Sequence, residues 1–111
     1  MSTKTRNEAL SGSLTLLVLK TLALGEMHGY GIASRIQQMS SDLLRVEEGS
    51  LYPALHRMEQ DGWISSNWGQ TESKRRARIY TITKAGRQQL EQELESWRRI
   101  TLGVSLVLEA V

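Results

Sequence analysis

The sequence of 111 residues has no cysteine, a single proline and no long uninterrupted apolar run. Without cysteine, the chain can form neither a disulfide nor a thiolate metal site. Its longest apolar stretch, residues 14–24, is interrupted by Thr15, Lys20 and Thr21 and is well below the ~20 apolar residues that a membrane span requires. The first residues also lack a small-residue cleavage signature. We therefore expect no secretory signal, no membrane partner and a cytoplasmic location.

The sequence also has little that could support catalysis. Its two histidines, His28 and His56, lie on different predicted elements and lack a metal-ligand spacing. The glycines of residues 29–31 lack the third glycine and the preceding strand of a phosphate-binding loop. The acidic pair at residues 47–48 has no apolar surroundings that would tune it for acid–base work. We expect a protein that is not an enzyme and that holds no metal or cofactor, and in which His28 orders the loop before the second helix.

What the sequence does contain is an uneven distribution of charge. Hydrophobic residues make up 40% and charged residues 23%, as in an ordinary globular domain, and the net charge is only +2. Residues 74–90, however, carry no acidic side chain, whereas acidic residues follow at positions 91, 93 and 95. The basic residues of this stretch are Lys74, Arg75, Arg76, Arg78, Lys84 and Arg87. Such a local concentration indicates a defined anion-binding surface.

Apolar spacing predicts two helices in the first forty residues. The polar residues 1–11 are expected to be loosely ordered. A first helix is predicted over residues 12–24, where apolar residues recur at helical intervals and Gly25 can end the helix. Ile32, Ile36 and Met39 predict a short second helix, which ends where residues 40–42 compete for backbone hydrogen bonds.

A third helix is predicted to begin at or just before Ser50 and to end at Gly62. Pro53 fixes the start, because proline is tolerated in the first turn, where its missing N–H has no intrahelical partner to lose. The expected apolar stripe is Leu51, Leu55 and Met58. The opposite side is expected to contain Ser50, Pro53, Ala54, His56, Arg57 and Gln60. Three short helices with tight connections are typical of a helix-turn-helix core.

The periodicity then changes to that of strands. Residues 63–68 and 78–82 are rich in β-formers and lack a helical stripe. Between them, residues 69–76 are too long for a tight turn and are basic at the tip, which predicts a hairpin with a protruding loop, a wing. Trp63 and Trp68 are expected to pack at the base of this wing rather than to stack on bases.

Thr83 is expected to cap a final helix with an apolar seam. The seam residues step by 4, 3, 4, 3, 4 and are Leu90, Leu94, Trp97, Thr101, Val104 and Leu108. So much apolar surface exceeds what a small core can cover, so a second copy of the chain is expected to cover it, with added contact from the first helix. The predicted fold is mainly α with a small β-hairpin. A winged helix-turn-helix domain occupies residues 1–83 and a dimerisation helix occupies residues 84–111.

Five segments, in order over residues 12–100, resemble the PadR family of regulators. They are GSLTLLVLKTLALG, HGYGIA, EGSLYPALHRMEQDGWI, KRRARIYTITKAG and ELESWRRI. The single short C-terminal helix resembles the compact subgroup. The resemblance implies a winged-helix homodimer, paired through that helix, that represses nearby genes by binding an operator. Many relatives release DNA on binding a small aromatic or drug-like effector. In some, a tryptophan in a similar E-S-W context stacks on flat ligands, which makes Trp97 a candidate effector contact as well as a seam residue.

The expected partner is double-stranded operator DNA on the nucleoid. Small and hydrogen-bonding side chains near the start of a recognition helix meet base edges in the major groove, and a basic wing contacts the phosphate backbone. The candidate DNA contacts are Tyr30, Ser50, Tyr52, Pro53, His56, Arg57, Lys74, Arg75, Arg76 and Arg78. Tyr52 has a structural alternative, since a tyrosine there can be half-buried.

Two other classes of function fit the same pattern. One is a winged helix that binds structured RNA, and the other is a winged helix that serves only as a protein-interaction adaptor. The basic tip of the wing disfavours the adaptor but does not separate DNA from RNA.

Overall fold

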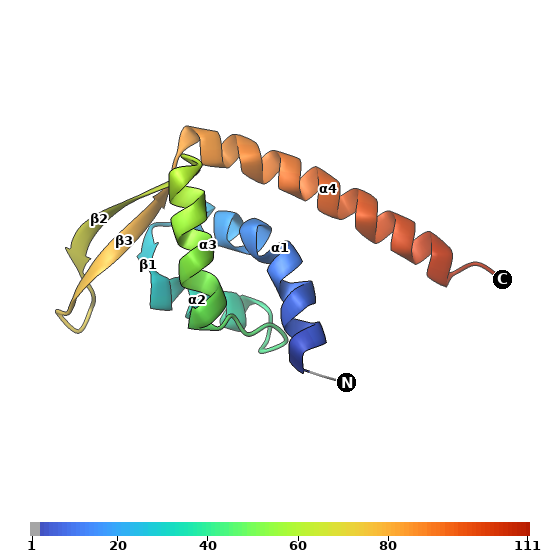
Figure 1. Cartoon of the computed structure of the whole chain (residues 1–111), viewed down its shortest axis with the longest axis horizontal. Helices are drawn as coiled ribbons and strands as arrows, with labels where there is room; N and C mark the ends of the chain where they lie inside the picture. The colour runs from blue at the N-terminus through green and yellow to red at the C-terminus, as the bar shows by residue number, and fades with distance from the viewer. Residues whose placement is uncertain (1–2) are drawn as a thin grey trace.

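The computed structural model describes residues 3–111, with side chains from residue 13 onward, as four helices and a small sheet (Figure 1). The elements are α1 (Thr3–Ala23), β1 (Met27–His28), α2 (Gly29–Met39), α3 (Glu48–Gln60), β2 (Ile64–Gln70), β3 (Arg76–Ile82) and α4 (Lys84–Leu108). The sheet is antiparallel with the order β1-β3-β2. This arrangement confirms the predicted fold class of a mainly helical chain with a β-hairpin.

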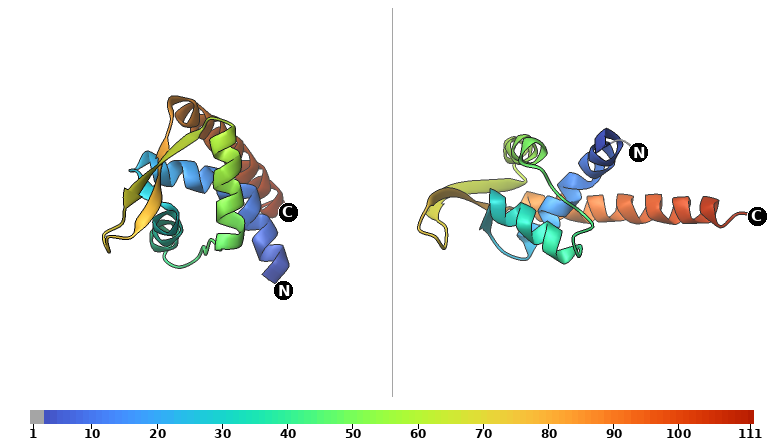
Figure 2. Two further views of the ribbon diagram at one scale, coloured as in Figure 1. Left: turned by 60° about the vertical axis from the view of Figure 1, so that its left-hand side comes forward. Right: turned by 90° about the horizontal axis from the view of Figure 1, so that it is seen from below.

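One hydrophobic core lies where α1, α2 and α3 meet the sheet and the first turns of α4. Its buried members from the helices are Leu14, Val18, Leu19, Leu22, Ile32, Ile36, Leu51, Ala54, Leu55, Met58 and Leu90, and the sheet adds Ile64, Tyr80 and Ile82. The β2–β3 hairpin extends away from this core at one end of the molecule, and α4 extends toward the other end (Figure 2). Among the described residues, no helix has the length and apolar character needed to cross a bilayer.

The first helix is longer than the sequence indicates. It begins at Thr3 rather than near residue 12. Residues 1–2 of the segment expected to be loosely ordered lie outside the described part of the chain. Leu24 follows the end of α1 and is 53% exposed, whereas Thr21 is buried. The Thr21 hydroxyl donates to the Leu17 carbonyl at 2.7 Å, which satisfies its hydrogen-bonding group inside the core.

The third helix also begins earlier than predicted, at Glu48. The carbonyl of Glu47 accepts hydrogen bonds from the N–H groups of Ser50 and Leu51, at 3.0 and 2.9 Å, and these bonds form the first turn. Pro53 therefore lies in the second turn, where it provides no N–H for the carbonyl four residues earlier. Ala54, which is predicted on the exposed side of α3, is buried against the core.

The wing is a tighter hairpin than expected. The strands pair as far as Gln70 and Arg76, so the loop contains only residues 71–75. The Thr71 N–H donates to the Arg75 carbonyl at 2.8 Å, and the Lys74 N–H donates to the Thr71 carbonyl at 2.9 Å. Lys74 has a φ of 62°, the left-handed conformation that closes a short hairpin of this kind. Arg76, expected in the loop, begins β3.

A single residue, Thr83, connects the hairpin to α4. Its hydroxyl accepts a hydrogen bond from the Gly86 N–H at 3.0 Å, which confirms the predicted helix cap. The same hydroxyl donates to the Gly62 carbonyl at 2.6 Å, and the Thr83 N–H donates to the Trp63 carbonyl at 3.0 Å. The end of α3, the root of the wing and the start of α4 are therefore fixed at one point.

Candidate nucleic-acid interface

The side of α3 that faces away from the core contains the predicted DNA-contacting residues. Leu51, Leu55 and Met58 are buried and hold the helix on the core. The residues on the exposed side are Ser50, Tyr52, Pro53, His56 and Arg57. The two sets alternate because residues three or four apart share one side of a helix. The packing of α3 therefore leaves a polar and aromatic surface free.

Tyr52 combines the two roles that the sequence leaves open. Its side chain remains 43% exposed, but its ring lies against Gly29, the first residue of α2. A methyl group at Gly29 would lie 2.7 Å from both Cε1 and the hydroxyl oxygen of Tyr52. The absence of a side chain at Gly29 thus lets Tyr52 link α3 to the start of α2.

The start of α2 is ordered by His28, as predicted. The His28 Nδ1 accepts a hydrogen bond from the Gly31 N–H at 3.0 Å and so caps the helix. The His28 ring also stacks on Tyr30, with ring centroids 6.3 Å apart and an interplanar angle of 9°. Tyr30 is 68% exposed, so the cap presents an aromatic side chain to solvent beside α3.

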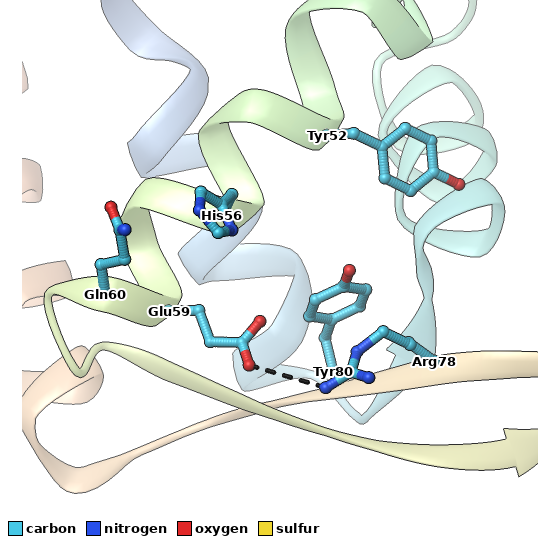
Figure 3. A pocket seen from close by; sticks show the side chains of 6 residues that line it. All are labelled: Tyr52, His56, Glu59, Gln60, Arg78 and Tyr80. Atoms are coloured by element: carbon cyan, nitrogen blue, oxygen red, sulfur yellow. Dashed lines mark ion pairs between the residues drawn. The ribbon is translucent and has the colours of Figure 1, made fainter.

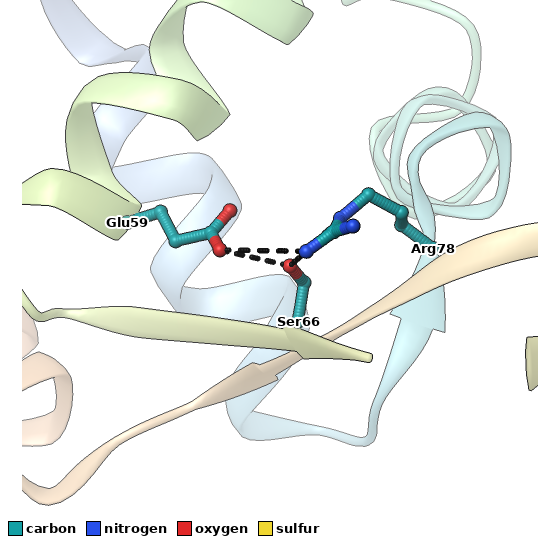
Figure 4. Close-up of polar contacts among 3 residues, drawn as sticks. All are labelled: Glu59, Ser66 and Arg78. Atoms are coloured by element: carbon teal, nitrogen blue, oxygen red, sulfur yellow. Dashed lines mark hydrogen bonds and ion pairs between the residues drawn. The ribbon is translucent and has the colours of Figure 1, made fainter. Parts of the chain in front are cut away.

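The wing presents its cations in two different ways. Lys74, Arg75 and Arg76 are exposed. Arg78, in contrast, is held by hydrogen bonds to a neighbouring side chain (Figure 4): its Nε and Nη2 donate to the Ser66 Oγ at 3.0 and 2.7 Å. The Ser66 hydroxyl donates to the Glu59 Oε2 at 2.9 Å, and Arg78 Nη2 lies 3.8 Å from the same oxygen. This cluster connects α3 to both strands of the wing.

The sequence predicts that Trp68 packs at the base of the wing, but in the structure it is 57% exposed. The guanidinium carbon of Arg76 lies 4.6 Å from the ring centroid of Trp68, and that of Arg78 lies 5.1 Å from it. Sequence reasoning missed these contacts because they depend on the strand register, in which Trp68 pairs with Arg78. Trp63, the other wing tryptophan, is half-buried against the core, as expected.

Two open grooves adjoin these side chains. The smaller, of about 540 Å³, lies between α3 and the wing and is lined by Tyr52, His56, Glu59, Gln60, Arg78 and Tyr80 (Figure 3). Burial raises the pKa of the Tyr80 hydroxyl above its ordinary value, and the negative charge of Glu59 raises it further, whereas Arg78 acts in the opposite direction.

The larger groove, of about 1360 Å³, runs from the start of α2 past Tyr52 to the wing. Among the predicted contacts it brings together Tyr30, Tyr52, Arg75, Arg76 and Arg78. It also includes Arg35 of α2, a cation that no sequence pattern selects. Four predicted contacts line neither groove and are exposed on the surface outside them: Ser50, Pro53, Arg57 and Lys74. Cations and hydrogen-bonding aromatic groups around one open groove suit a polyanion.

The structure divides the predicted α4 seam into two parts. Leu90 is 8% exposed and belongs to the core of its own chain, and Leu94 packs against that core. The remaining seam residues are exposed: Trp97, Thr101, Val104 and Leu108. The C-terminal part of α4 extends beyond the other helices (Figure 1). Only this second part leaves apolar area for a partner.

Two relatives among the known proteins that match differ in length. A transcriptional regulator of Mycobacterium tuberculosis is 36% identical over 94 residues, which are 82% of this chain and 84% of that protein. An uncharacterized 37.1 kDa protein of transposon Tn4556 from Streptomyces fradiae is 41% identical over 86 residues. The match covers 78% of this chain but only 23% of the length of the transposon protein.

Solved structures share the same fold. A transcriptional regulator from Clostridium thermocellum has a TM-score of 0.80 and 30% identity, over 88% of this chain and 95% of that one. Bacillus subtilis PadR, a negative transcriptional regulator solved in complex with operator DNA, has a TM-score of 0.64 and 27% identity. That alignment covers 73% of this chain and 45% of PadR.

The model of the PadR-like transcriptional regulator family matches residues 18–92. The matched segment extends from α1 through the wing into α4, and so includes α3, the start of α2 and the basic hairpin. A family of transcriptional regulators also confirms the prediction that the protein is not an enzyme. The chain belongs to the PadR-like family of transcriptional regulators.

Proposed function

We propose that the protein is a sequence-specific DNA-binding regulator that acts as a homodimeric repressor on an inverted-repeat operator. The observation that carries this proposal is the larger groove, around which the start of α2, Tyr52 of α3 and the cationic side of the wing come together. Such a surface offers both phosphate contacts and groups that can contact bases. The alignment with B. subtilis PadR, which is solved with operator DNA, supports the proposal.

In this proposal, residues 1–83 form the DNA-binding domain and α3 enters the major groove. The contacts proposed for α3 are Ser50, Tyr52, Pro53, His56 and Arg57, which meet base edges or adjacent phosphates. The wing contacts DNA phosphates through Lys74, Arg75 and Arg76. Tyr30, at the start of α2, contacts the DNA backbone. Arg78 acts chiefly by holding the wing, because two of its nitrogens are already bound to Ser66.

Residues 84–111 pair two copies in this proposal through the exposed part of the α4 seam. A two-fold dimer places its two α3 helices about one helical turn, ~10 base pairs, or a multiple of it apart. The assignment as a repressor is supported by the negative regulator of B. subtilis. Trp97, 48% exposed, offers a flat surface for a small aromatic effector. Binding to chromosomal DNA places the protein on the nucleoid in the cytoplasm.

The test is to select bound fragments from the source genome. Binding of the selected duplex, a scrambled duplex and a structured RNA is then measured across a salt series. We expect the selected duplex to contain an inverted repeat and to bind about 10³-fold or more tightly than the scrambled one. Failure to select any sequence, or tighter binding of the RNA, would contradict the proposal.

Variants of the two elements then test the division of roles. Arg75→Ala is expected to weaken binding to all duplexes similarly and to reduce the salt slope by about one unit per lost phosphate contact. His56→Ala is expected to reduce the difference between selected and scrambled duplexes. If the wing variant lost discrimination and the α3 variant lost only salt dependence, the two roles would be reversed.

A further inference from the structure

The exposed face of the wing contains an aromatic ring between two cations. Trp68 on β2 is directly opposite Arg78 on β3, and Arg76 lies two residues along β3 from Arg78. Because side chains two residues apart in a strand point to the same face, all three share one face of the hairpin. Both guanidinium groups lie over the Trp68 ring, at 4.6 Å for Arg76 and 5.1 Å for Arg78.

The two arginines differ in how they are held. Arg78 is bound to Ser66 and lies near Glu59, so its position is fixed from α3. Arg76 is exposed, and its guanidinium group contacts the ring of Trp68. When a guanidinium group lies over an aromatic ring, the flat face of the guanidinium contacts the ring. The N–H donors on the edge of the guanidinium remain available for other acceptors.

We infer that Trp68 is a positioning residue that holds Arg76 ready to bind a DNA phosphate. The inference rests on the DNA binding proposed above and adds a residue that this proposal does not use. An arginine that is free to rotate loses side-chain entropy when it binds a phosphate, whereas an arginine held on a ring has already lost part of it. Glu59 and Ser66 support the arrangement by holding Arg78 on the same ring.

The experiment measures binding to a fluorescein-labelled duplex of arbitrary sequence, about 30 base pairs long, at low salt. Phosphate contacts supply most of the affinity under these conditions. Trp68→Leu is expected to weaken binding about two- to tenfold per protomer, the range for immobilising one long side chain. Trp68→Phe retains an aromatic face and is expected to bind within about twofold of wild type. Thermal unfolding of both variants establishes that they fold.

Double-mutant cycles identify the arginine through which Trp68 acts. In an Arg76→Ala background, Trp68→Leu is expected to have little further effect, because the side chain that it positions is gone. In an Arg75→Ala background, which removes a wing cation outside the Trp68 contacts, the effect of Trp68→Leu is expected to be the same as in wild type. Equal effects in both backgrounds, no effect of Trp68→Leu, or a Trp68→Phe variant as weak as Trp68→Leu would each overturn the inference. A wild-type protein that does not bind the duplex would instead refute the proposed function itself.

Discussion

The phenol ring of Tyr52 lies so close to Gly29 that a methyl group there would be 2.7 Å from the Tyr52 hydroxyl oxygen. Gly29→Ala is therefore expected to displace the partly exposed Tyr52 ring from α2 and to lower the free energy of unfolding by up to about 1 kcal/mol, less than overpacking in a closed core costs, because the end of the ring can move aside. In a Tyr52→Ala background the same substitution is expected to have little effect. Denaturant unfolding of the four proteins measures the coupling, and an equal loss in both backgrounds would show that another contact is responsible.

Two glycines of α4 provide a matched pair. A methyl group at Gly86 would overlap the backbone carbonyl of Trp63 and lie 2.8 Å from the Ile82 Cγ1. Gly86→Ala is expected to destabilise the protein by about 3 kcal/mol, because backbone cannot move aside easily. At Gly103, no atom of the described residues beyond the helix backbone and chain neighbours lies within 4 Å of that position. Gly103→Ala is therefore expected to stabilise the helix by up to about 1 kcal/mol. Similar unfolding curves for the two variants would contradict this packing.

The raised pKa of Tyr80 predicts a loss of stability at high pH. Above pH ~10, tyrosine in the unfolded chain releases its proton, whereas Tyr80 in the folded chain retains it. The unfolded state then binds fewer protons, so the stability present below pH ~10 falls as the pH rises toward the folded pKa. Tyr80→Phe is expected to reduce this loss, and Glu59→Gln is expected to lower the pKa of Tyr80. Ultraviolet titration together with denaturant unfolding checks both, and an unchanged pH profile in Tyr80→Phe would contradict the prediction.

Pairing through α4 is tested at Val104, which is exposed and does not belong to the core. Light scattering of the wild-type protein at micromolar concentration is expected to give about twice the 12.5 kDa chain mass. Val104→Asp places a charge in the seam and is expected to give the single-chain mass. Leu102→Asp is the control, because Leu102 is exposed on the opposite side of the helix. Leu94 is unsuitable, since it packs against its own core. A wild-type monomer would refute the pairing.

The proposed effector role of Trp97 predicts a separable defect. Planar aromatic compounds are expected to quench part of the tryptophan fluorescence of the wild-type protein. Trp97→Ala is expected to remove that component and the binding, while affinity for operator DNA changes little, because Trp97 lies on α4 and the proposed DNA contacts lie on α2, α3 and the wing. Unchanged affinity for the compounds in this variant would assign Trp97 to structure alone.

Sequence reasoning predicted the elements with strong periodicity and failed where a tertiary contact decides the outcome. The stripe of Leu51, Leu55 and Met58 predicts α3 correctly because helical spacing alone defines its buried side. The sequence predicts the wrong side of α3 for Ala54, because a small side chain between two core positions gives no polarity signal. The sequence also predicts the wrong turn for Pro53, because the bonds to the Glu47 carbonyl begin the helix at Glu48, two residues before Ser50.

The wing illustrates a second kind of limit. The sequence predicts its two strands and its basic tip but not its register, because Gly69 and Gln70 resemble a loop. The loop that closes the hairpin contains Lys74, a non-glycine residue in the left-handed conformation, for which sequence patterns provide only weak evidence. The contacts of Trp68 and Arg78 follow from that register, so they could not be predicted without it.

The connection through Thr83 has a consequence for operator architecture. One residue separates the wing from α4, and it is held by hydrogen bonds to Gly62, Trp63 and Gly86. The two elements are therefore not joined by a flexible linker. In a dimer built on α4, the two DNA-binding surfaces would therefore be held at a fixed separation. Such a protein would tolerate base changes within a half-site better than the insertion of a single base pair between the two half-sites.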